Sequence, residues 1–188
     1  MASYYQTNRL VQTNWAEIVQ RCKSGDRHAQ SEAYRMSWRI IYPSVYLVMR
    51  NREDAEDVMQ EAYIKGFSKL ADLTAPEKYV AWQKMICVRE AISRVRRKKN
   101  FTILFPEFNE NIKDPIEEKD ERYEIPTEQL AKHIGKLPQG YQMIIQLHIM
   151  EKMSHQEIGD QLGIGASTSR SQYSRALTKL RKEIGVEK

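Results

Sequence analysis

Apolar residues recur every three or four positions through most of this chain, and this spacing constrains its fold more than any other feature. In one run the apolar positions are Tyr79, Trp82, Met85, Ile86, Val88, Ile92 and Val95. That period matches the 3.6 residues per turn of an α-helix, whereas the strict alternation typical of a half-buried strand is scarce. We therefore expect an all-α fold with no substantial sheet.

Comparable stripes predict further helices on both sides of that run. We expect them over residues 15–22, 29–41, 51–70 and 127–135, and from Pro138 onward. Asn51 is a good N-cap for the third of these, because its side-chain oxygen can accept a backbone N–H of the first turn. Pro43 should lie near the end of the second helix or at the start of the next turn of chain.

A stretch without this periodicity separates the helices into two groups. Residues 101–126 contain three prolines and hold 3 Lys and Arg against 8 Asp and Glu, whereas residues 1–100 hold 18 against 11 and residues 127–188 hold 9 against 6. A Pro-containing, acidic segment of this kind is typical of a loop or linker. The expected organisation is an N-terminal tail (1–14), a helical domain (15–100), an acidic linker (101–126) and a second small helical domain (127–188).

The overall composition is that of a soluble globular protein. Hydrophobic residues make up 41% of the chain and charged residues 29%, and no apolar run is long enough to span a bilayer. Residues 1–14 contain no apolar segment of the kind found in signal peptides. Cys22 and Cys87 stand far apart and fit no metal or redox spacing. We therefore expect a cytoplasmic protein without membrane insertion, whose cysteines are reduced thiols.

The last third of the chain has the pattern of two short helices joined by a tight turn. Ser154 and Glu157 have the spacing of a capping box, which starts a helix, and Gly163 can end that helix in the left-handed conformation. The helix that follows carries polar and basic residues on one side, namely Arg170, Ser171, Ser174 and Arg175. This is the layout of a helix-turn-helix, whose second helix can enter the DNA major groove. The alternative is an ordinary helical hairpin with a solvated basic face.

The run that begins at Tyr79 ends in a dense group of basic residues. They are Arg94, Arg96, Arg97, Lys98 and Lys99, and Arg89 precedes Arg96 by two turns on the same face. Such cations can hold phosphates, while rings near the start of the helix, Tyr79 and Trp82, suit unstacked bases. A solvated basic end is the alternative. For Trp82 alone, its spacing to apolar neighbours favours a place in the core.

Acidic residues cluster on the third expected helix. Glu53 and Asp54 lie in its first turn, where the helix dipole favours them. Asp57 and Glu61 form a like-charge pair at i,i+4, which should cost roughly 0.2–0.5 kcal/mol and therefore indicates a basic partner surface. A solvated face is the second interpretation. A metal site is the third, although no His stands at ligand spacing.

Nothing in the sequence argues for an enzyme. The four histidines fall on four separate segments, and none pairs with a Cys or an acid in a catalytic pattern. There is also no nucleophile elbow, no phosphate-binding Walker loop and no zinc-protease motif. We expect no catalytic residue, no metal and no cofactor.

Three strings resemble, in the correct order, bacterial sigma factors of the extracytoplasmic-function (ECF) group. DAEDVMQEAYIKGFSKL (residues 54–70) looks like the helix that binds core RNA polymerase, and YVAWQKMICVREAISRVRRKK (79–99) is similar to the helix that melts the promoter and reads its minus-ten element. LPQGYQ (137–142), followed by MSHQEIGDQLGI and STSRSQYSRALTKLR, resembles the helix-turn-helix that binds the minus-thirty-five element. SGDRHA (24–29) fits the opening of the family.

The resemblance implies a role for each group of residues. Asp54, Asp57, Gln60 and Glu61 would face the basic coiled-coil clamp of the polymerase's largest subunit. The fourth helix, with Arg89, Arg94, Arg96, Arg97 and Lys98, and the loop over residues 73–78 would hold the unwound strand and a flipped base. Arg170, Ser171, Ser174 and Arg175 would lie in the upstream major groove, with Gln156, Ser167 and Thr168 on phosphates.

The same resemblance implies further partners, and the chain departs from the family pattern at several positions. The implied partners are the polymerase flap, promoter DNA and an anti-sigma factor. The acidic linker would thread the channel of the polymerase that holds the template strand and the RNA. Arg89 stands where the family usually has Asn, which bears on the minus-ten base preference, and Gly165 replaces the usual Ser at an N-cap. Two other functions compete: a stand-alone helix-turn-helix regulator that contacts polymerase, and a nucleic-acid enzyme using the acidic cluster with Mg²⁺.

Overall fold

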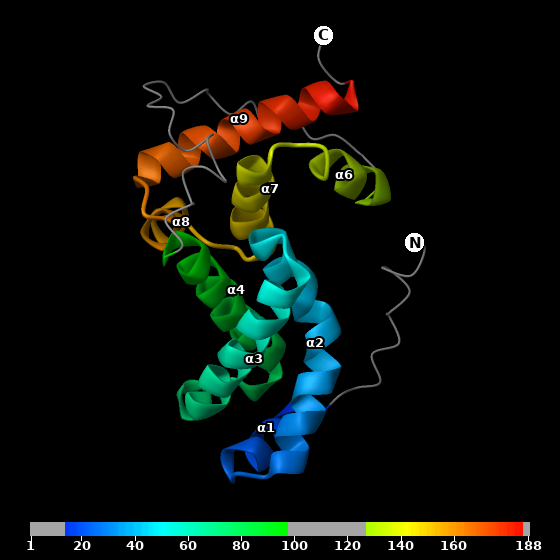
Figure 1. Ribbon diagram of the computed structural model, residues 1–188, viewed down its shortest axis with the longest axis vertical. Coiled ribbons are helices and arrows are strands. Elements are labelled where there is room, and N and C mark those ends of the chain that lie inside the picture. Colours follow the sequence, from blue (N-terminus) through cyan, green and yellow to red (C-terminus); the bar gives the residue numbers. More distant parts are fainter. Residues whose placement is uncertain (1–13, 98–126, 186–188) are drawn as a thin grey trace. The chain divides into compact units, whose positions relative to one another are not determined.

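The computed structural model describes residues 14–97 and 127–185, and the regular secondary structure in these ranges is entirely helical (Figure 1). The prediction of an all-α fold is confirmed. The chain divides into two compact units, one of residues 1–46 with 51–88 and the other of residues 47–50 with 89–188. The expected linker over residues 101–126, and Lys98 just before it, lie outside the described residues.

The first unit begins with α1 (Trp15–Lys23) and a tight turn into α2 (Arg27–Met49). Asp26 shapes this turn, because its Oδ1 accepts the backbone N–H of His28 at 2.8 Å while its Oδ2 accepts Arg21 Nη2 at 2.8 Å. The hydrogen bond from Arg21, followed by the backbone bond from Ala29, holds the pKa of Asp26 below its usual range. The carboxylate of Asp26 therefore caps the start of α2.

Helix α2 is longer than the sequence indicated, because it continues through Pro43 to Met49. Proline lacks the N–H of an internal helical hydrogen bond and normally ends or kinks a helix. Here the apolar stripe resumes beyond it, with Ile41, Val45 and Val48 all buried. Burial on both sides of the proline holds the helix together where local propensity disfavours it.

Helix α3 (Arg52–Ser68) starts as predicted at Asn51, whose Oδ1 accepts the N–H of Asp54 at 2.9 Å. It ends two residues before the predicted boundary and passes into the short 3₁₀ turns η1 (Leu70–Asp72) and η2 (Pro76–Lys78), which lead into α4 (Tyr79–Arg97). Two hydrogen bonds tie these helices. Ser37 of α2 meets the hydroxyl of Tyr63 at 2.6 Å, and Gln83 donates to the carbonyl of Ala62 at 3.0 Å.

The core of this unit fixes the segment between α3 and α4. Its buried cluster comprises Ile18, Val19, Cys22, Ala29, Ala33, Leu70, Leu73 and Tyr79. Lys23 adds a polar tie, donating from Nζ to the carbonyl of Leu73 at 3.0 Å. Trp82 packs against the cluster, so the sequence-based preference for a core tryptophan is confirmed.

The second unit contains α6 (Thr127–Ile134), α7 (Gln139–Ile145), a π-helical turn η4 (Gln146–Met150), α8 (His155–Leu162) and α9 (Ala166–Ile184). Helix α9 packs on both α7 and α8 (Figure 1). Met143, Ile144, Leu147 and Ile158 are among its most completely buried side chains. The π-helical turn was not predicted, since hydrophobic periodicity does not separate it from the α-helix that it extends.

Candidate functional site

A complete capping box starts α8, the first helix of the helix-turn-helix. Ser154 Oγ accepts the N–H of Glu157 at 3.2 Å, and Glu157 Oε2 accepts the N–H of Ser154 at 2.8 Å. The backbone and side-chain hydrogen bonds from Ser154 lower the pKa of Glu157 from its ordinary value. The capping box predicted from the sequence is confirmed, and it places His155 and Gln156 in the first turn of α8.

Two glycines set the turn between α8 and α9. Gly163 ends α8 in the left-handed region at φ 73°, as predicted, and its N–H donates to the carbonyl of Gly159 at 2.8 Å. Position 159 has room only for glycine, because a Cβ there would lie 2.8 Å from the backbone oxygen of Ile164. The turn therefore passes directly over the last turn of α8, and Gly165 serves as the N-cap of α9 without a side-chain bond.

The residues predicted to contact DNA from α8 and α9 differ in accessibility. Gln156, Ser167 and Arg170 are exposed, and Thr168 and Arg175 are half-buried. Ser171 and Ser174 are only 6% and 5% exposed, so these two are not on an open surface in this structure. Both serines lie on the face of α9 opposite Ala176 and Leu180, and it is the face of Ala176 and Leu180 that packs into the unit. A contact between either serine and DNA requires that it first become accessible.

The basic end of α4 is mostly open to solvent. Arg89, Arg96 and Arg97 are exposed and Arg94 is half-buried, while Arg97 also donates to Ser93 Oγ at 3.1 Å. In the loop that precedes this helix, Leu73 is buried, whereas Thr74, Glu77 and Lys78 are exposed. The loop thus has an anchored start and an accessible end.

An acidic face runs along α3, formed by Asp57, Gln60, Glu61 and Ile64 with Asp54 near its start. Asp57, Gln60 and Glu61 are exposed and Asp54 is half-buried. Ile64 is 72% exposed among them, although the opposite side of the helix is buried at Ala55, Val58, Met59, Ala62 and Tyr63. Sequence reasoning missed Ile64, even though its spacing of seven from Asp57 and four from Gln60 places it on this face. An exposed isoleucine on the same face as acids suits a protein partner better than a metal ion.

Two histidines that are separate in sequence come together in the second unit. The rings of His148 and His155 stack with centroids 4.3 Å apart, and Tyr173 meets His148 edge-on at 4.6 Å. His148 Nδ1 lies 2.8 Å from the carbonyl of Met153, which fixes the donor on that nitrogen, and His155 Nδ1 lies 3.0 Å from Ser169 Oγ. These contacts bind α8 to α9 and to the π-helical turn, so the pair has a structural use.

Within residues 14–97 and 127–185, no three His, Cys, Asp or Glu side chains gather closely enough to hold a metal ion. In the same residues no helix combines the length and the apolar composition that crossing a bilayer needs.

Comparison with known proteins gives matches in both units. The family model described as Sigma-70 region 2 matches residues 27–101, and the one described as Sigma-70, region 4 matches residues 127–180. The chain is 26% identical over 176 residues to the ECF RNA polymerase sigma factor SigW of Bacillus subtilis (strain 168), covering 88% of this chain and 94% of that protein. It is 27% identical over 147 residues to the RNA polymerase sigma factor SigV of the same organism, covering 78% and 86%.

Among solved structures, the chain is similar to CnrH in a complex with the cytosolic domain of CnrY. The identity is 18%, the match covers 92% of this chain and 97% of that one, and the TM-score is 0.48. A second structure, the sigma factor RpoE bound to the anti-sigma factor NepR from Bartonella quintana, matches with 16% identity and a TM-score of 0.47, covering 84% and 98%.

An all-helical chain with a helix-turn-helix after a separate helical unit, matched by both sigma-70 regions, is a sigma-70-type transcription initiation factor. Within that class the chain belongs to the ECF group, and it directs promoter-specific transcription initiation. The family resemblance seen in the sequence is confirmed.

Proposed function

We propose that the acidic face of α3 binds the basic coiled-coil clamp of the largest subunit of core RNA polymerase. The observation that carries this proposal is the exposed Ile64 on the same helix face as Asp57, Gln60 and Glu61. An apolar centre with charges around it is the usual anatomy of a protein interface, and acids there complement a basic partner.

The promoter is held at two points. The arginines at the end of α4, with Lys98, neutralise phosphates of the unwound non-template strand, and the loop over residues 73–78 accepts a flipped base. Exposed arginines along one helix and an anchored loop with an open end support this assignment. Arg89 sits nearest to the middle of that helix and is the candidate for setting the base preference.

The helix-turn-helix anchors the upstream element in the major groove. Arg170 and Arg175 read base edges together with Ser171 and Ser174 once these serines are uncovered, and Gln156, Ser167 and Thr168 contact phosphates. The capped first helix and the short glycine turn support this assignment, because they fix the entry angle of α9. The flap of the polymerase is the proposed protein contact of this unit, and the acidic linker occupies the channel for template and RNA.

Transcription reconstituted with sigma-free core polymerase tests the whole proposal. We expect a promoter-specific transcript on a cognate template only when the protein is added. A stand-alone regulator would instead change the output of another sigma factor and give no transcript with core alone. Absence of a specific transcript on every cognate template would refute the proposed function.

Matched charge variants test the polymerase contact. Asp57→Asn and Glu61→Gln should weaken binding to core polymerase, and the loss should shrink as salt is raised, because exposed charge pairs are screened. Asp72→Asn is the control, since Asp72 is an exposed acid on η1, outside α3. Equal losses in all three variants would mean that only the net charge matters.

A second matched set tests base reading by α9. Arg170→Ala and Arg175→Ala should each cost about 1–3 kcal/mol on the cognate upstream element and much less on unrelated DNA, as expected for base-edge contacts. Lys179→Ala removes the same charge from an exposed position of the same helix and serves as the control. Equal losses of binding free energy on all DNA sequences would mean that the arginines contact only phosphates.

An anti-sigma partner and a cytoplasmic location complete the proposal. Both rest on membership of the ECF group rather than on any one residue of this chain. Co-purification of the full-length protein with a bound inhibitor that is displaced by core polymerase would support the partner. Fractionation that recovers the protein only with membranes would contradict the location.

A further inference from the structure

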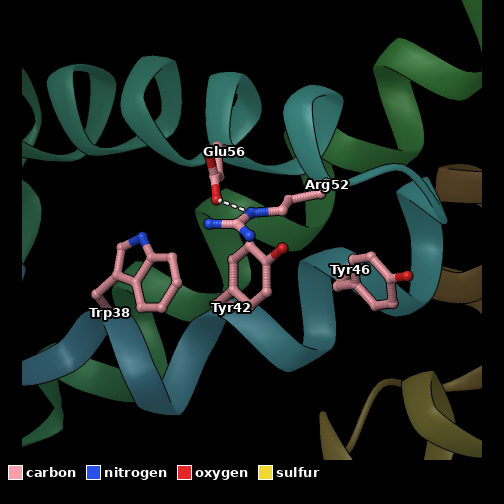
Figure 2. Close-up of a pocket in the computed structure, with 5 residues that line it drawn as sticks. All are labelled: Trp38, Tyr42, Tyr46, Arg52 and Glu56. Atoms are coloured by element: carbon pink, nitrogen blue, oxygen red, sulfur yellow. Dashed lines mark hydrogen bonds and ion pairs between the residues drawn. The ribbon is translucent and has the colours of Figure 1, made fainter.

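Three aromatic rings form a ladder on the outside of the first unit. Trp38, Tyr42 and Tyr46 follow one another at intervals of four along α2, with centroid separations of 4.4 Å and 5.9 Å and interplanar angles of 17° and 25°. With Arg52 and Glu56 of α3 they line an open groove of about 330 Å³ (Figure 2). We call this the aromatic groove.

The core of the unit does not account for the aromatic groove. None of its three rings belongs to the buried cluster, and Tyr46 is 41% exposed. Aromatic side chains supply large contact areas and are over-represented at protein interfaces. A stacked row of them along an open groove is therefore a surface that a partner can cover.

The groove already holds one cation, which comes from the chain itself. Arg52 Nε donates to Glu56 Oε1 at 2.8 Å, and Figure 2 shows the guanidinium lying between that carboxylate and the ring of Tyr42. A carboxylate beside aromatic rings can bind a cation through an ion pair and, where the cation lies over a ring, a cation–π contact. The chemistry of the groove is that of a receptor for guanidinium or ammonium groups.

Arg52 is held there weakly. Its side chain is 81% exposed, and exposed ion pairs contribute little to stability. Its place at the start of α3 puts a positive charge at the positive end of the helix dipole, and an Arg four residues before a Glu is the less favourable order of such a pair. An incoming cation can therefore displace Arg52 at small cost.

We propose that a basic side chain from a helix of core polymerase enters the aromatic groove, pairs with Glu56 and stacks on Tyr42 while Arg52 moves out to solvent. This inference rests on the proposed function, because the groove continues the acidic face. Glu53 and Gln60 lie one turn to either side of Glu56 on the same helix, so one basic helix can span both surfaces. Charge complementarity favours that occupant over DNA, whose phosphates Glu56 would repel.

The test is the affinity of the full-length protein for core polymerase, measured by titration of a fluorescently labelled protein. Tyr42→Leu and Glu56→Gln should each weaken binding by about tenfold, as a desolvated cation–π or ion-pair anchor would. Arg52→Ala should leave the affinity unchanged or raise it, because it removes the competing cation. Ile40→Ala, an exposed apolar residue of α2 outside the groove, is the control and should have no effect.

The variants separate this inference from the proposed function. If Arg52→Ala weakens binding as much as Glu56→Gln, Arg52 is itself the contact and the inference is overturned. If Tyr42→Leu and Glu56→Gln bind normally while Asp57→Asn binds poorly, the inference fails and the proposed function stands. If Tyr42→Leu and Glu56→Gln weaken the affinity for single-stranded promoter DNA but not the affinity for core polymerase, the occupant is nucleic acid and the inference is again overturned. Failure of the unmodified protein to bind core polymerase would overturn both the proposed function and this inference.

Discussion

The close passage of the turn over α8 makes Gly159→Ala a sharp test of how the helix-turn-helix is built. In an unobstructed helix interior, replacing glycine by alanine stabilises by about 1 kcal/mol. At Gly159 the added Cβ would lie 2.8 Å from the backbone oxygen of Ile164 and 3.3 Å from the nitrogen of Ala166. Both are main-chain atoms that cannot rotate away, so the turn must shift, at a cost of roughly 1–3 kcal/mol. We expect net destabilisation and weaker binding to the upstream element.

The assay follows from the placement of the tryptophans. The chain has three, Trp15, Trp38 and Trp82, and all lie in the first unit. Denaturation followed by circular dichroism reports both units, whereas tryptophan emission reports the first. Gly159→Ala should therefore lower the stability seen by circular dichroism with little change in the emission transition, while Gln161→Ala in the same helix is the control. A variant as stable as the parent, or more stable, would refute the reasoning about the turn.

Three further outcomes follow from local geometry. Ser154→Ala should destabilise the second unit by about 1 kcal/mol, because the N–H of Glu157 loses its side-chain acceptor. That bond does not depend on the charge of Glu157, so most of the difference between the two proteins should persist in acid. Only the part from the hydrogen bond of Ser154 Oγ to the Glu157 carboxylate, whose pKa is lowered in the folded state, should be lost as the pH falls through that lowered pKa, which denaturation of both proteins across pH checks. Burial raises the pKa of the Cys22 thiol to about 11, so Cys22 and the equally buried Cys87 should react with a thiol reagent far more slowly in the native than in the unfolded protein; equal rates would contradict their burial. Pro43→Ala should stabilise the protein by roughly 2 kcal/mol, because it restores a helical N–H within α2, and a less stable variant would mean that the proline is accommodated for another reason.

Features that depend on neighbours in sequence were predictable. The cap at Asn51, the capping box of Ser154 and Glu157, and the left-handed Gly163 each follow from hydrogen bonds or backbone freedom within four residues. The function was predictable for the same reason, because each stretch that resembles the ECF group is contiguous in the sequence. The sequence also favoured a core position for Trp82, because its spacing matched an apolar stripe.

Features that depend on packing were not predictable. Helix α2 continues through Pro43 because residues on both sides of it are buried, and the spacing of Ile41, Val45 and Val48 alone does not show that their burial outweighs the proline. The stacking of His148 on His155 joins segments that periodicity treats as unrelated. The low exposure of Ser171 and Ser174 was not predictable either, because helical spacing gives the direction of a side chain but not what covers it.

The hydrogen bond from Lys23 to the carbonyl of Leu73 has a consequence for recognition of the melted strand. Together with the burial of Leu73 and of Tyr79, the first residue of α4, it anchors the loop over residues 73–78 on both sides of its exposed residues. A preorganised loop loses little conformational entropy on binding, so a base captured at the proposed site would meet a shape that already exists. Sequence changes in α1, which itself touches no proposed base, would then alter minus-ten selectivity by loosening that shape.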